Sequence, residues 1–146
     1  MVLNRQRGVR VRVKDLTRFL ARARRALRLP AESVSVCLVT DSDIARWNRA
    51  YRGKPGPTDV LSFPAGDENG SGPKPGRISP SLYLGDIAIA PAVARRNARR
   101  FSRPFGQEMR ILILHGMLHL MGYDHETDSG QMDRREKRLR RSLGLA

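Results

Sequence analysis

The stretch Ile111-Leu-Ile-Leu-His-Gly-Met-Leu-His-Leu-Met121 is apolar around nearly the whole circumference of a helix. A helix without a polar face is stable where other elements cover it, so this stretch predicts a buried helix against a sheet. Gly122 follows, and glycine readily takes the left-handed backbone conformation that ends many helices. We therefore expect the fold to be built around one central helix that carries His115 and His119.

The segments on either side of this helix predict an α+β fold with a mixed sheet of about four strands. Period-two alternation and short apolar runs give strands at 9–13, 34–40, 60–63 and 82–90. Helical spacing gives helices at 15–28, from Pro91 to about 100, from Phe105 or Gly106, and at 129–143, and residues 41–43 offer N-caps for one further short helix. The last of these presents Met132, Glu136, Leu139 and Leu143 on one side. No repeat or boundary interrupts the pattern, so 1–146 is expected to form a single domain.

The charge of the chain points to a polyanionic partner. Twenty-eight basic and 14 acidic residues give a net charge of +14. Lysine and arginine side chains near phosphates release condensed counterions, which makes nucleic acid the leading candidate. The basic helices at 15–28 and 92–103 would steer such a partner toward the functional site. The alternative is that the arginines reflect genome composition and form solvated helix faces.

Composition also excludes several classes of protein. The single cysteine, Cys37, allows no internal disulfide and no zinc site built from cysteines, and its apolar surroundings predict a small core residue. No apolar run approaches the roughly 20 residues that cross a bilayer, and the N-terminus has no signal-peptide pattern. We therefore expect a cytoplasmic protein without a membrane partner.

All three histidines lie within one short segment, His115-Gly-Met-Leu-His-Leu-Met-Gly-Tyr-Asp-His125. His115 and His119 are four residues apart, so a helix places both side chains on one face. Gly122 can turn the chain so that His125 reaches the same point. Two such histidines can also be ordinary hydrogen-bonded core residues, but the glycine and third histidine favour a metal site with a position left for water. Imidazole ligands suit zinc, and also nickel, copper or iron.

The same spacing occurs in zinc peptidases of the metzincin type, where a glutamate that acts as general base follows the first histidine. Gly116 occupies that position here. A peptidase mechanism would therefore lack its proton acceptor. Asp124 could orient a ligand, accept a proton or cap the loop, and Glu108 is expected to be a partner of the helix dipole rather than a base.

Three segments together resemble the YbeY family of bacterial ribosomal-RNA maturation endoribonucleases. They are the histidine segment 115–125, Tyr51-Arg-Gly-Lys54 with Pro57-Thr-Asp-Val-Leu-Ser-Phe-Pro64, and Leu84-Gly-Asp-Ile87. The resemblance runs from about Val34 to the final helix. It implies a fold related to the zincins, one zinc ion held by His115, His119 and His125, and cleavage of single-stranded RNA. It also implies a part in small-subunit ribosomal-RNA maturation and ribosome quality control, with the small subunit and assembly factors as partners.

The resemblance gives Arg52 the role of the family arginine that contacts the RNA phosphate. A guanidinium can hold the phosphate and stabilise the additional negative charge of its transition state. The alternative is a surface arginine that bonds the last carbonyls of a helix. Structural roles are expected for Asp59 and Asp86, while Thr58 and Ser62 could contact substrate or only support the turn and the strand edge. The chain departs from the family pattern in its insertion at 67–77 and in its arginine content.

Two further functions stay open at this stage. A non-catalytic ribosome-assembly factor would keep the charge and use the metal only to hold residues 122–125 in place. A metallopeptidase would share the histidine spacing, but Gly116 argues against it.

Overall fold

A computed structural model describes residues 1–65, 83–124 and 126–145. The strands are β1 (Val2–Asn4), β2 (Val34–Leu38), β3 (Val60–Pro64) and β4 (Gly85–Ile89). The helices are α1 (Val13–Ala26), α2 (Asp41–Arg52), α3 (Pro91–Arg100), α4 (Phe105–Leu120) and α5 (Gln131–Ser142). The predicted insertion at 67–77 and the predicted ligand His125 lie outside the described residues.

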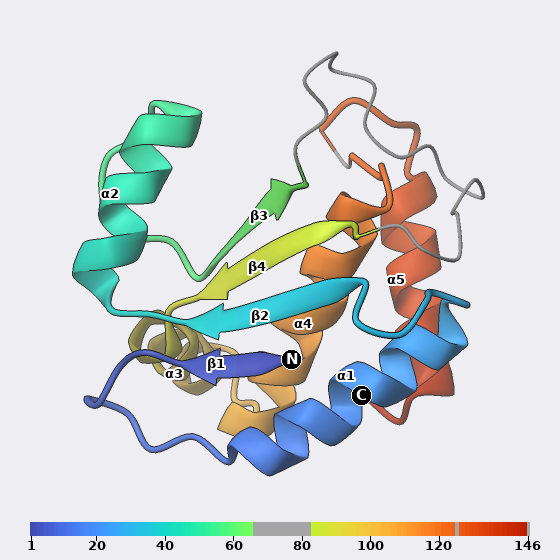
Figure 1. Cartoon of the computed structure of the whole chain (residues 1–146), viewed down its shortest axis with the longest axis horizontal. Coiled ribbons are helices and arrows are strands. Elements are labelled where there is room, and N and C mark those ends of the chain that lie inside the picture. Colours follow the sequence, from blue (N-terminus) through green and yellow to red (C-terminus); the bar gives the residue numbers. More distant parts are fainter. Residues whose placement is uncertain (66–82, 125, 146) are drawn as a thin grey trace.

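The described strands form one mixed sheet in the order β1-β2-β4-β3 (Figure 1). β1, β2 and β4 are parallel, and β3 runs antiparallel to β4 with Leu61 opposite Ala88. β3 is therefore an edge strand, and one end of it borders the C-terminal part of α4. The predicted α+β class and mixed sheet are confirmed.

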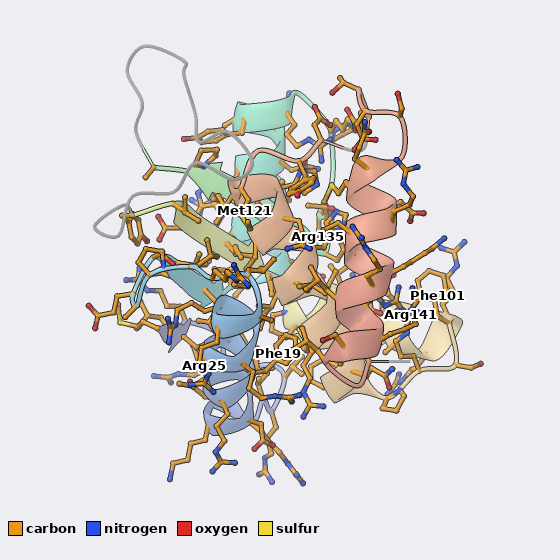
Figure 2. All side chains as sticks on the ribbon, turned by 90° about the vertical axis from the view of Figure 1, so that its right-hand side faces the viewer. Phe19, Arg25, Phe101, Met121, Arg135 and Arg141 are labelled. Atoms are coloured by element: carbon orange, nitrogen blue, oxygen red, sulfur yellow. The ribbon has the colours of Figure 1, made fainter. Side chains whose placement is uncertain are left out.

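Helix α4 is the centre of the fold, as its apolar sequence predicts. It contacts β3 and β4 on one side and α1, α3 and α5 on the others. Figure 2 shows α4 between the sheet and α5. The side chains of Ile113, Leu114, Met117 and Leu118 are completely buried. His115 and His119 are only half-buried, whereas the residues between and around them in the C-terminal half of this helix are buried.

The predicted strand at 9–13 is wrong. The first strand is β1, and Val13 already begins α1. The backbone of Val9 bonds the side chain of Gln6 instead of a neighbouring strand: Val9 N donates to Gln6 Oε1 at 2.9 Å, and Gln6 Nε2 donates to the Val9 carbonyl at 2.8 Å. Val9 is buried and Val11 packs against the core, so their alternation reflects burial of a loop and not sheet pairing.

The opposite face of the sheet is covered at one end by α2. Ile44 of α2 is buried against Leu61 and Ala88, with Trp47 and Phe63 beside them. The N-cap of α2 is Thr40, whose hydroxyl accepts from the amide of Asp43 at 3.1 Å, and not the expected 41–43 segment. In the described part of the chain, the rest of this face lies open as a hollow over β2 and β4.

Cys37 lies on this open face and is half-buried rather than a full member of the core. Burial raises the pKa of the Cys37 thiol. No helix among the described residues is both long and apolar enough to cross a membrane.

Candidate active site

A cleft of about 480 Å³ opens at the C-terminal end of α4. Its walls come from the end of α2, the strand β3, α4 and the loop that follows α4. Arg52, His115 and His119 all line it. The structure thus brings together three of the four residues that the sequence singles out, although Arg52 lies more than 60 residues before the histidines.

The two histidines face each other across one helical turn. Nε2 of His115 lies 3.1 Å from Nε2 of His119, and the rings meet edge to face with centroids 4.7 Å apart. The i and i+4 positions of α4 give this proximity directly. Both imidazoles therefore direct the same type of nitrogen to one point in the cleft.

Glu136 of α5 holds His115 from the other side. Its Oε1 lies 2.7 Å from Nδ1 of His115, and its side chain is only 14% exposed. An ionised carboxylate accepts hydrogen bonds and donates none, so Nδ1 carries the hydrogen. In the neutral form of such a ring the lone pair of Nε2 faces the cleft, and that is the form in which histidine binds a metal ion. Arg140 also lies near Glu136, with Nη1 3.9 Å from Oε2.

Arg52 forms an ion pair with Glu126 in the loop that follows α4. Nη2 of Arg52 is 3.3 Å from Oε1 of Glu126, and both side chains are well exposed. Exposed pairs of this kind contribute at most about 1 kcal/mol, so an incoming anion can displace the carboxylate. Gly53 ends α2 in a left-handed conformation (φ 64°) directly after Arg52.

The backbone of Gly116 lies against the sheet, where a side chain would not fit. A Cβ at this position would meet Cδ1 and Cγ2 of Ile87 at 2.9 Å. The carbonyl of Gly116 also accepts from the Ser62 hydroxyl at 3.2 Å. The place of the metzincin glutamate is therefore closed by β4, and no catalytic side chain can be accommodated there without repacking.

The loop after α4 begins as the sequence predicts. Gly122 has a positive φ of 97°, and its amide bonds the carbonyl of His119 at 3.0 Å. The amide of Tyr123 bonds the carbonyl of Leu118 at 3.1 Å, which completes a Schellman cap. Asp124 lines the cleft, and its Oδ1 accepts from the amide of Glu126 at 3.0 Å, so it serves the loop turn.

Within the described part of the chain, no group of three or more histidine, cysteine, aspartate or glutamate side chains is placed to hold a metal ion. The donors present are the two facing imidazoles of His115 and His119. Because His125 is not described, its position relative to this pair is not part of the structure. The chemistry of the pair, with one ring oriented by a carboxylate, fits a zinc-type ion.

Asp59 and Asp86 make structural contacts, as expected for them, whereas Glu108 pairs with an arginine side chain and not only with the helix dipole. Oδ2 of Asp59 accepts from Asn97 of α3 at 3.2 Å, and Glu108 is buried beside Arg103, with 2.5 Å between Oε1 and Nη1. Asp86 lies on the opposite face of the sheet, where it accepts from the Tyr83 hydroxyl. Ser62 supports α4, while Thr58 lines the cleft.

The basic helices α1 and α3 contribute no residue to the wall of the cleft. α1 contacts β1, at the sheet edge opposite to β3, and α3 precedes the N-terminal end of α4 (Figure 1). Their arginines can therefore act on a polyanion only at a distance, through the overall field of the protein.

Sequence reasoning missed the role of Glu136. The signal was present, because Glu136 stands between Met132 and Leu139 on the side of α5 that is otherwise apolar. A carboxylate on a buried helix face requires a partner, and here that partner is His115. The sequence could not show that α5 packs beside the histidine face of α4.

Comparison with known proteins identifies relatives over nearly the whole chain. The family model described as Endoribonuclease YbeY matches residues 3–144. An Endoribonuclease YbeY from Solibacter usitatus is 48% identical over 72% of this chain, and one from Koribacter versatilis is 37% identical over 99% of it. The solution structure of TM1509 from Thermotoga maritima superposes with a TM-score of 0.58 at 28% identity, covering 98% of this chain and 89% of that one.

The lengths of these relatives differ. The match spans 62% of the Solibacter usitatus protein and 55% of an Anaeromyxobacter relative, but 86% of the Koribacter versatilis protein. The family model and the long matches agree on the same description. The chain belongs to the Endoribonuclease YbeY family.

Proposed function

We propose that this protein is a metal-dependent endoribonuclease that cleaves single-stranded RNA in the cleft lined by Arg52, His115 and His119. Its cellular role would be maturation of small-subunit ribosomal RNA and ribosome quality control in the cytoplasm, with the small subunit and assembly factors as partners. The membership of the family supports the reaction class and the RNA substrate. The observation that carries the proposal is that a guanidinium and two facing imidazoles line the same cleft.

His115, His119 and His125 would hold one zinc ion, or another divalent transition metal, in this cleft. When bound, such an ion supplies Lewis-acid polarisation of a phosphoryl oxygen. The contribution of Glu136 is to fix the ring of His115 with its Nε2 lone pair toward the cleft. That interaction fixes the ring orientation and the tautomer that leave Nε2 available to a metal ion.

Arg52 would exchange Glu126 for the phosphate of the RNA chain. Its guanidinium can donate two parallel hydrogen bonds to phosphate oxygens, and it stabilises the charge that develops as the phosphodiester bond breaks. Because the ion pair with Glu126 is exposed, the exchange costs little.

A peptidase function has little support in the structure. The position that carries the general base in metzincins is Gly116, and a side chain there would collide with Ile87. A non-catalytic assembly factor remains the second candidate, since the charge of +14 would serve ribosome binding equally well.

The proposal is tested by zinc analysis of purified protein together with cleavage of a single-stranded RNA and of an unstructured peptide. Wild-type protein is expected to hold about one zinc ion per chain, cut the RNA and leave the peptide intact. His115→Ala and His119→Ala should each lose metal and cleavage. RNA that stays intact with metal-loaded wild type, combined with an unfolded His119→Ala, would support the assembly factor instead.

A further inference from the structure

A second hollow, of about 460 Å³, lies on the sheet face opposite α4. Its floor is formed by β2 and β4, through residues that include Cys37 and Ala88. Its wall toward α2 is aromatic and consists of Trp47, Tyr51 and Phe63. Tyr51 and Phe63 also line the cleft of the candidate active site, so the two hollows are neighbours that share one aromatic boundary.

The aromatic wall consists of two partly buried rings, Trp47 and Phe63, and one exposed ring, Tyr51. Phe63 meets Trp47 edge to face with ring centroids 5.9 Å apart, and it meets Tyr51 in the same way at 4.8 Å. Tyr51 ends this row and is 71% exposed. It directly precedes Arg52 in the sequence. Exposed aromatic rings beside a basic group are the typical platform on which bases of a single strand stack.

The hollow is also lined by polar groups of different kinds, both hydrogen-bond donors and acceptors. Arg5 supplies a cation, Ser35 a hydroxyl and Asp86 a carboxylate. Asp86 accepts from the Tyr83 hydroxyl, and Arg5 is exposed. An apolar floor with donors and acceptors at its edge matches a flat heterocycle with polar edges better than it matches an aliphatic chain.

We propose that this hollow binds a nucleobase of the RNA strand, close in the strand to the phosphate that Arg52 holds. The proposal rests on the RNA substrate of the proposed function. Continuity favours this occupant, because Tyr51, the neighbour of Arg52 in sequence, lines both the hollow and the cleft. Since the Asp86 carboxylate can only accept hydrogen bonds, bases that carry an amino group should bind better than uracil.

Trp47, the only tryptophan in the chain, makes the proposal directly measurable. The experiment titrates full-length protein with 2′-O-methyl hexanucleotides, which resist cleavage, and follows Trp47 fluorescence together with strand anisotropy. A strand of the same length built of abasic nucleotides serves as the phosphate-only probe. Base-containing strands are expected to quench Trp47 and to slow alkylation of Cys37, while the abasic strand does neither.

Two matched pairs of variants locate the binding site. Tyr51→Ala is expected to weaken hexanucleotide binding about fivefold to a hundredfold. Phe101→Ala also removes an exposed ring, but Phe101 lines neither hollow, so this variant should bind like the wild type. Arg5→Ala should reduce Trp47 quenching more than Arg7→Ala does. Both changes remove one exposed positive charge, but only Arg5 lines the hollow.

The outcomes separate this proposal from the proposed function. Strands that bind by anisotropy with no change at Trp47, or with equal effects in each matched pair, would overturn the nucleobase site and leave RNA binding intact. Such a result would point to a protein partner for the open sheet face. Failure of every strand to bind at low salt would overturn both proposals together.

Discussion

Nδ1 of His115 lies 2.7 Å from Oε1 of Glu136, so a carboxylate on α5 orients an imidazole on the central helix. This relationship links the last helix of the chain to the cleft that Arg52 and His119 also line. It gives α5 a function beyond covering the core. It also implies that substitutions on α5 can alter the chemistry of the cleft, although no residue of α5 lines it.

Replacement of Glu136 by alanine should lower zinc affinity by about tenfold to a hundredfold, because His115 loses the partner that fixes its ring and tautomer. Competition with a zinc chelator measures this effect. Glu136→Gln should restore part of the affinity, since its carbonyl oxygen can still accept from Nδ1. Asp133→Ala is the control: Asp133 lies on the exposed side of α5, paired with Lys137. Equal affinities in all four proteins would show that Glu136 has no orienting role.

Gly116 provides a test of the packing between α4 and β4. Gly116→Ala should destabilise the protein by about 1 kcal/mol or more, because overpacking against Ile87 outweighs the helix propensity of alanine. Gly106→Ala in the same helix meets no atom within 4 Å and should be neutral or stabilising by up to about 1 kcal/mol. Urea denaturation of both variants measures the difference. Similar stabilities for the two would mean that β4 does not close the 116 position.

The ion pair between Arg52 and Glu126 is expected to compete with RNA. Glu126→Gln removes the carboxylate, so the KM for a single-stranded RNA should fall by up to about fivefold, the factor that corresponds to an exposed pair of about 1 kcal/mol. The same change in charge at Asp133→Asn, which lies outside the cleft and pairs with Lys137, should lower KM less. A KM that rises in Glu126→Gln would instead indicate that Glu126 is needed to position Arg52.

Cys37 should react slowly with alkylating reagents near neutral pH, since burial raises the pKa of its thiol and the thiolate is the reactive form. The rate of iodoacetamide reaction, measured against pH, should therefore reach its midpoint at a higher pH in the native protein than in urea. The folded state disfavours the thiolate, so ionisation of Cys37 in the unfolded chain reduces stability as the pH rises past the unfolded pKa. Identical midpoints in both states would contradict this view.

Much of the fold follows from periodicity in the sequence. The apolar stretch at 111–121 correctly predicts the buried helix α4, and helical spacing predicts α1, α3 and α5 close to their observed bounds. The alternating valines at 9–13 mislead, because a Gln6 side chain satisfies the backbone of Val9 where strand pairing was expected. The sequence pattern did not predict β1, because only Val2 of its three residues is partly buried and the strand therefore has no apolar alternation.

The candidate site could be predicted less completely than the fold. The i and i+4 spacing fixes His115 and His119 on one face, and the family resemblance adds Arg52. Only the tertiary structure shows that α2 ends beside them and that Glu136 reaches His115 from α5. Contacts between elements far apart in sequence depend on how the helices pack, which local patterns do not specify.

The central claim is that Arg52 and the histidine pair form one RNA-cleaving site. The most direct measurement compares Arg52→Ala with Arg18→Ala, since Arg18 also forms an exposed ion pair, to Asp15 at 3.2 Å, but lines neither hollow. Single-stranded RNA cleavage and zinc content are measured on the same preparations. We expect Arg52→Ala to keep its zinc and lose at least about a hundredfold in kcat/KM, the size of effect for one transition-state donor, while Arg18→Ala matches wild type. Cleavage by Arg52→Ala at the wild-type rate would contradict the account.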